Sequence, residues 1–107
     1  MFKAMILLTR REDVTHDEFV DWWLTEHVPL ASSLPHLRKV VLNVVDVGAE
    51  ETGVDGISEL WFDSQADFEA AYASEIGKAT AADSQAHVSG RVRLFVTENE
   101  YVGPGSA

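Results

Sequence analysis

The chain has 107 residues, enough for one domain, and 46% of them are hydrophobic, so it can build its own core. It contains no cysteine, which excludes disulfides, thiolate metal sites and a cysteine nucleophile. The formal net charge of −10 disfavours binding to nucleic acid or to an anionic membrane. Such an acidic surface serves solubility, for example in a high-salt cytoplasm, or attracts cationic partners.

The N-terminal run MFKAMILLTRR carries its charges after the apolar stretch, unlike a signal peptide. No apolar run in the chain is long enough to span a membrane. We therefore expect a cytoplasmic protein.

The first predicted elements are a strand and a helix. The apolar run at residues 1–9 predicts a strand that is buried on both faces. Thr15 is a helix N-cap, and Glu18 three residues later completes a capping box. At about 100° per residue, one face of this helix is apolar. That face consists of Phe19, Val20, Trp23, His27, Leu30, Ala31 and Leu34. Pro29 lacks a backbone donor, so we expect a break near His27 and a gap beside its ring.

The rest of the chain continues to alternate strand and helix signals. The predicted elements are a strand at 37–47, an acidic loop at 48–56, a strand at 57–62, a helix beginning at Ser64 that Gly77 interrupts, a short helix at 78–88 and a last strand at 91–102. We expect one domain over residues 1–102, and residues 103–107 as a flexible C-terminal tail.

The order of these elements predicts the fold class. A βαββαβ order with right-handed crossovers gives a ferredoxin-like α+β fold, in which both helices cover one face of a four-stranded antiparallel sheet. The strands are too apolar on both sides to leave the other face in water. The economical solution is a homodimer that packs sheet face against sheet face.

Two stretches resemble the EthD family of the dimeric α+β barrel superfamily. THDEFVDWWLTEHVPLASSLPHLRKVV (15–41) has the capped acidic helix, the aromatic pair and the EH-x-P-L motif, and ELWFDSQADFEAAYAS (59–74) is similar to a later strand-to-helix segment. The resemblance implies a homodimer that forms a dimeric α+β barrel, with a cleft between each sheet and its helices. It also implies relatives among cofactor-free muconolactone isomerases and polyketide cyclases or decarboxylases, and among proteins of ether degradation. The family's histidine corresponds to His27. The methylmuconolactone isomerases use a cysteine that this chain lacks.

Three residues are candidate catalytic groups. His27 suits acid/base chemistry, because imidazole exchanges protons near neutral pH, but it can equally be a core histidine bonded to a freed carbonyl. Glu59 orients His27 if it faces the helices, or pairs with Arg91 or Arg93 if it faces the dimer side. The Tyr72 hydroxyl stabilises an enolate if it faces the cleft, or else the ring packs with its tip in water.

Four further residues are candidate ligand contacts. Trp23, Leu30 and Trp61 suit a flat apolar ligand, although aromatic residues at this spacing also form cores. Asn43 is placed to polarise a carbonyl or is a satisfied edge residue.

The remaining histidines do not indicate a metal site. His16 is expected to be exposed at the start of the first helix, and His36 and His87 have no partner that the sequence identifies. The four histidines have no metal-ligand spacing, and there is no phosphate-binding loop and no nucleophile elbow.

The leading hypothesis is a small-molecule enzyme without a cofactor. It would be an acid/base isomerase, cyclase, dehydratase or decarboxylase acting on aromatic, lactone or polyketide-like compounds. The alternative is a non-catalytic ligand-binding or accessory dimer, or a haem-handling protein of the same fold with His27 as the iron ligand.

Overall fold

The computed structural model describes residues 1–46 and 48–104, and it contains one four-stranded antiparallel sheet. The strands are β1 (Phe2–Arg10), β2 (Lys39–Val44), β3 (Gly56–Phe62) and β4 (Val88–Val96). They lie in the order β2-β3-β1-β4, with every neighbouring pair antiparallel. This is the ferredoxin-like order, so the predicted fold class is confirmed.

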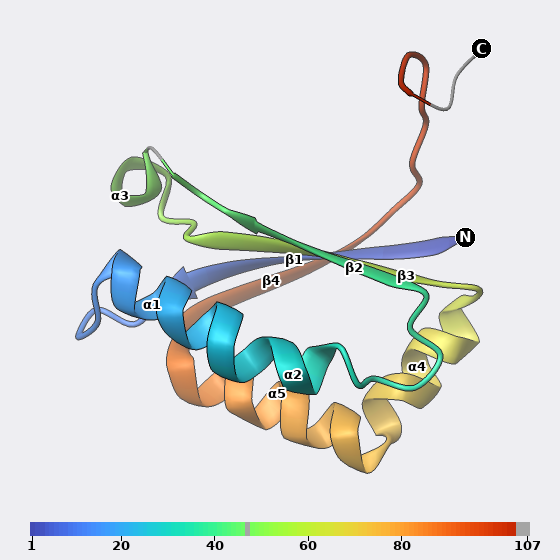
Figure 1. The fold of residues 1–107 in the computed structure, drawn as a ribbon, viewed down its shortest axis with the longest axis horizontal. Helices are drawn as coiled ribbons and strands as arrows, with labels where there is room; N and C mark the ends of the chain where they lie inside the picture. Colours follow the sequence, from blue (N-terminus) through green and yellow to red (C-terminus); the bar gives the residue numbers. More distant parts are fainter. Residues whose placement is uncertain (47, 105–107) are drawn as a thin grey trace.

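The helical segments other than α3 all cover the same face of the sheet (Figure 1). They are α1 (His16–Trp22), a π-helical turn η1 (Trp23–His27), α2 (Val28–Ala31), α4 (Gln65–Ala73) and α5 (Glu75–His87). The segments α1, η1 and α2 form one continuous rod, and η1 and α2 pack against α5. The opposite face of the sheet has no helical cover in Figure 1, apart from the short α3 (Ala49–Thr52) beyond one end.

The core lies between the sheet and these helices. Alternation on β1 directs Ala4, Ile6 and Leu8 toward the helices, and on β3 it directs Leu60 and Phe62 the same way. The helices contribute Phe19, Trp22, Trp23, Leu34, Phe68 and Ala71. The two sets of side chains pack against each other and hold the helices on the sheet.

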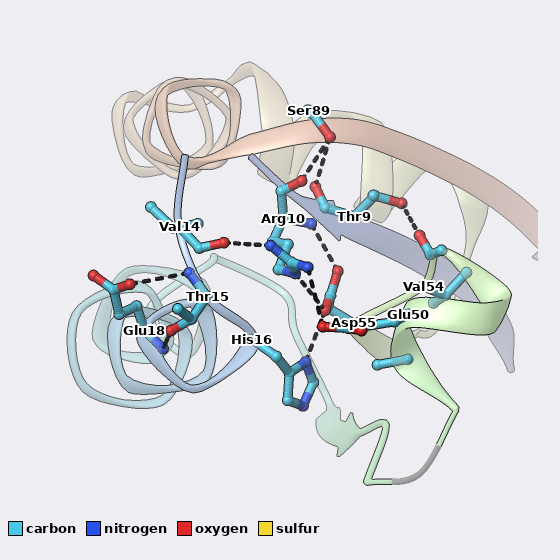
Figure 2. Close-up of polar contacts among 12 residues, drawn as sticks. Thr9, Arg10, Val14, Thr15, His16, Glu18, Glu50, Val54, Asp55 and Ser89 are labelled. Carbon is cyan, nitrogen blue, oxygen red and sulfur yellow. Dashed lines mark hydrogen bonds and ion pairs between the residues drawn. The ribbon is translucent and has the colours of Figure 1, made fainter. Parts of the chain in front are cut away.

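A network of polar contacts anchors the start of α1 (Figure 2). The predicted capping box is present: the Thr15 hydroxyl accepts from the Glu18 backbone N–H at 3.1 Å, and the Glu18 carboxylate accepts from the Thr15 N–H at 3.0 Å. Asp55, at the start of β3, lies 2.7 Å from His16 Nδ1 and accepts from the Arg10 backbone N–H at 2.9 Å. The expectation that His16 is exposed was wrong, because its side chain is 22% exposed and paired.

Several helices and loops begin or end at other residues than predicted, for reasons that lie in the local structure. The loop at 48–56 contains the short α3, enclosed by Gly48 and Gly53 with φ of 83° and 71°, which glycine adopts without strain. The break between α4 and α5 falls at Ser74 rather than Gly77, because the Ser74 hydroxyl caps α5 by accepting from the Gly77 N–H at 3.0 Å. A Cβ on Gly77 would lie 2.2 Å from the Ala71 carbonyl oxygen, so glycine is needed for this close helix junction.

The predicted strands also differ in length from those observed. The second strand is shorter than 37–47, and position 47 lies outside the described residues. The last strand begins three residues before the predicted start and ends at Val96. Of the predicted tail, residues 105–107 lie outside the described part of the chain, and the domain boundary at 102 stays a prediction.

Candidate functional site

The π-helical turn η1 places His27 beside the sheet. At its end the Val28 backbone N–H donates to the Trp23 carbonyl five residues back, and Pro29 lies in the first turn of α2. The sequence predicted a break near His27, but the helix continues there and only widens into a π-helical turn, a feature often found at functional sites. Trp22 and Trp23 are both buried, at 7% and 1% exposure, because Trp22 stacks on His87 of α5 and Trp23 lies against Gly56 of β3.

His27 lines a hollow between the sheet, η1, α4 and α5. The centre of a water-sized sphere can occupy only about 20 Å³ of it, and the space between atoms, open solvent at the mouth included, is about 410 Å³. Its lining consists of Ile6, Leu8, Trp23, His27, Ala31, Val40, Leu42, Ser58, Leu60, Tyr72, Thr80, Ala81, Ser84 and Arg91. The wall is therefore mostly apolar, with a small group of polar side chains.

Asp83 on α5 fixes the orientation of the His27 ring. His27 Nδ1 lies 2.9 Å from Asp83 Oδ2, and the His27 side chain is only 9% exposed. An ionised carboxylate only accepts hydrogen bonds, so this contact assigns the proton to Nδ1. In the neutral ring Nε2 then carries the lone pair and is the nitrogen left for a ligand.

Asp83 also holds a second histidine, one helical turn further along α5. His87 Nδ1 lies 2.8 Å from the Asp83 carbonyl oxygen and 3.3 Å from Asp83 Oδ1. The Trp22 ring stacks on His87 with centroids 4.5 Å apart and tilts against His27 at 5.1 Å. Its buried Nε1 has no hydrogen-bond partner within residues 1–46 and 48–104. These four side chains form one compact aromatic and polar group behind the hollow.

Two of the other predicted site residues also line the hollow. Trp23 packs flat over Gly56, where a Cβ would lie 2.6 Å from the indole ring. Tyr72 faces the hollow from α4, and burial raises the pKa of its hydroxyl, although Arg91 and Arg93 act in the opposite direction. Its O–H therefore stays protonated at neutral pH and is available as a donor.

The other four predicted site residues do not reach the hollow. Glu59 and Trp61 alternate with the core residues of β3, so they lie on the sheet face away from His27, and Asn43 pairs beside them from β2. Glu59 is held by Lys3 Nζ at 2.8 Å and by Asn43 Nδ2 at 3.0 Å. Leu30 is half-buried and is absent from the lining.

The predicted pairing of Glu59 with Arg91 or Arg93 was wrong as well. The register pairs Leu8 with Arg91 and Ile6 with Arg93, which puts both arginines on the helix side of β4. Glu59 is on the opposite side, where Lys3 is its cationic partner.

The Lys3–Glu59 pair predicts a loss of stability in acid. The hydrogen bond from Lys3, with a second from Asn43, holds the pKa of Glu59 below its usual value of 4.5. A carboxylate with a lowered folded pKa stabilises the fold above its unfolded pKa, and this contribution is lost as the pH falls through the folded pKa. We expect urea midpoints to fall below pH 4.5, and to fall less in Glu59→Gln.

Glu12→Gln, at an exposed position, is the control for that measurement and should keep the wild-type acid profile. At the alkaline end, burial alone would lower the pKa of Lys3, but Glu59 and Glu98 outweigh it and the pKa is raised. The Lys3 contribution is therefore complete below pH 10.5 and is lost only above that value. Identical acid profiles for Glu59→Gln and wild type would contradict the assignment.

Sequence reasoning missed Asp83 and His87. No local spacing connects them to His27, since Asp83 lies 56 positions further along the chain. A signal was present within the last predicted helix, where Thr80 and Ser84 lie four residues apart and are both buried. Residues four apart lie on the same face of a helix, so these two mark the face that borders the hollow.

The sheet order places the protein among ferredoxin-like α+β proteins. Residues 11–90 match the EthD domain, and the chain belongs to the EthD family. It is 29% identical over 105 residues to an uncharacterised 11.0 kDa protein of the thcB–thcC intergenic region of Rhodococcus erythropolis, covering 97% of this chain and 100% of the relative.

Two solved structures illustrate the shared fold. An EthD family protein from Bacillus halodurans has a TM-score of 0.78 at 20% identity, covering 92% of this chain and 100% of that one. A hydroxynitrile lyase from Passiflora edulis has a TM-score of 0.74 at 17% identity, covering 95% and 96%. In the part of the chain that the structure describes, no helix is long and apolar enough to cross a membrane.

Proposed function

We propose that this protein is a cofactor-independent acid/base enzyme acting on a small, largely apolar organic molecule. The observation that carries the proposal is the His27–Asp83 pair at the wall of a mostly apolar hollow. A buried imidazole that a carboxylate orients through Nδ1 presents Nε2 as a directed base.

The chemistry that fits is proton transfer next to a carbonyl. Nε2 of His27 takes a proton from an acidic C–H, and the electron pair moves into the carbonyl to form an enolate. Tyr72 lines the same hollow, and its hydroxyl is a suitable donor to the enolate oxygen. Return of the proton to another atom gives isomerisation, and attack of the enolate on a second carbonyl gives cyclisation.

The activities named for two proteins with a similar fold support the proposal that this protein is an enzyme acting on a small molecule. One structural neighbour is the hydroxynitrile lyase, and another is SnoaB from Streptomyces nogalater, described as a cofactor-independent oxygenase, with a TM-score of 0.69 at 11% identity. From these neighbours we take only the proposal that a protein of this fold can catalyse a reaction of a small molecule.

We also propose a homodimer formed through the uncovered sheet face. Val92 and Leu94 on β4 point to this side and are 53% and 45% exposed. The segment after β4 extends away from the body on the side opposite the helices, with Tyr101 and Val102 about 90% exposed (Figure 1). Solved neighbours from Thermobifida fusca and Bacteroides fragilis are described as dimeric ferredoxin-like proteins.

The enzyme proposal is tested by hydrogen exchange in D₂O. The protein is incubated with a panel of β-keto esters, lactones and aromatic ketones, and loss of the C–H signal is followed by proton NMR. We expect at least one compound to exchange faster than in buffer, and His27→Asn to reduce that rate by about 100-fold or more. Asp83→Asn should have a comparable effect, because an amide at this place permits the wrong ring tautomer.

His36→Asn is the matched control. His36 is exposed, and its φ of 66° lies in a region that asparagine also tolerates, so this variant should fold and exchange like wild type. Exchange that survives His27→Asn would remove the histidine from the mechanism.

A second candidate is a non-catalytic binding or accessory protein. It is favoured by the narrowness of the hollow, in which the centre of a water-sized sphere can occupy only about 20 Å³, so that a substrate would have to widen it. The same volume argues against a haem, since a porphyrin is far larger than one water molecule. A panel without any exchange above buffer would favour this second candidate.

A further inference from the structure

Two arginines lie on the helix side of β4, and one of them, Arg91, borders the hollow. The register places Arg91 opposite Leu8 and Arg93 opposite Ile6, both of which point toward the helices. Arg91 lines the hollow together with Tyr72. β4 is an edge strand and has no neighbouring strand on its outer side. Both arginines are exposed to solvent.

Neither arginine is neutralised by the protein itself. The chain has 18 acidic residues against 8 lysines and arginines, so most cations should find a carboxylate. Within residues 1–46 and 48–104, four of the eight form ion pairs: Lys3, Arg10, Arg11 and Arg38. No carboxylate of this part of the chain is paired with Arg91 or Arg93.

The surroundings of the pair are aromatic rather than acidic. The Arg93 guanidinium lies over the rings of Phe68 and Phe95, at 5.3 and 5.1 Å from their centroids. Residues two apart on one strand face are about 7 Å apart, so the two positive charges repel each other in the absence of an anion. An anion bound between the hollow and the solvent would reduce this repulsion.

We propose that Arg91, assisted by Arg93, forms a subsite for the carboxylate of a small organic acid. The carboxylate would lie at the mouth of the hollow, with the apolar part of the molecule directed toward Trp23 and His27. This inference rests on the proposed function and narrows its substrates to those that carry a carboxylate. A guanidinium suits phosphate as well, but phosphate sites usually add backbone N–H groups of a helix N-terminus or glycine-rich loop, and this wall is made of side chains in mid-strand and mid-helix.

The test compares matched probes by calorimetry on the full-length protein. Benzoate carries the charge, benzamide has the same shape without it, and phenyl phosphate carries the other anion. We expect benzoate to bind more tightly than both, and Arg91→Gln to weaken benzoate about tenfold while leaving benzamide unchanged. The control is Arg38→Gln, an exposed arginine at the start of β2 on the opposite edge of the sheet, which should bind like wild type.

Three results would overturn the subsite: equal binding of acid and amide, no binding of either, or tighter binding of phenyl phosphate. An Arg91→Gln protein that still prefers benzoate would also overturn it. The His27→Asn variant separates this inference from the proposed function, because it should keep the benzoate preference and lose only the hydrogen exchange. If exchange persists in wild type without any carboxylate preference, the subsite fails while the acid/base proposal stands.

Discussion

Replacement of Asp55 by alanine should lower the free energy of unfolding by about 3 kcal/mol, a large share of the stability of a small domain. The Asp55 side chain is 3% exposed and accepts from the Arg10 backbone N–H at 2.9 Å. It also lies 2.7 Å from His16 Nδ1 and 3.5 Å from Arg10 Nε (Figure 2). Alanine would leave these donors without a partner in a partly buried place.

This cost should be visible because Asp55 joins three parts of the chain that are distant in sequence. It connects the end of β1 to the start of α1 and the start of β3, and the Arg10 side chain donates onward to the Val14 carbonyl. The measurement is urea unfolding followed by tryptophan fluorescence, since Trp22 and Trp23 are buried.

Asp63→Ala is the matched control for that experiment. Asp63 forms an ion pair with Arg38 at 3.6 Å, but its side chain is 61% exposed, so its loss should cost less than about 1 kcal/mol. Equal effects of the two variants would show that the Asp55 network contributes no more than a surface pair.

The elements that were predicted correctly depend on local chemistry. The Thr15–Glu18 capping box and the Ser64 cap are formed by residues within three positions, so the sequence determines them directly. The irregular turn near His27, although not the predicted break, accords with the missing N–H of Pro29 two residues later. The order of strands and helices then leaves few topologies, and the observed sheet order is the expected one.

The part of the site that was missed depends on register and long-range packing. The alternation along β3 showed that Glu59 and Trp61 lie on the same face of the sheet. Only the pairing of β3 with β1 shows which face of the sheet the helices cover. Asp83 meets His27 only because α5 packs against η1, a contact between segments that no sequence spacing connects. The arginines of β4 were assigned to the wrong side of the sheet for the same reason.

A charged residue on the uncovered sheet face should convert the proposed dimer to a monomer. This face carries a continuous apolar surface around the Lys3–Glu59 pair, made by Met5, Leu7, Val41, Ile57, Val92, Leu94 and Val96. A stable interface buries about 800 Å² on each partner, a patch comparable to one face of a small sheet. A carboxylate introduced there would lose its hydration in a subunit that already has a net charge of −10.

Leu94→Asp and Leu24→Asp form a matched pair for this test. Both leucines are similarly exposed, at 45% and 44%, but Leu94 lies on the uncovered sheet face and Leu24 lies on η1. Light scattering should give a dimer for wild type and Leu24→Asp and a monomer for Leu94→Asp. Circular dichroism should confirm that both variants keep their secondary structure, because neither side chain is buried in the core.

A monomeric wild type would refute the dimer and leave the apolar face without an occupant. A dimeric Leu94→Asp would instead move the interface away from β4. If the monomeric variant also loses hydrogen exchange while keeping its fold, the hollow depends on the second subunit. Retained exchange would place the whole of the chemistry around His27 and Asp83 within one chain, as the 2.9 Å contact between them leads us to expect.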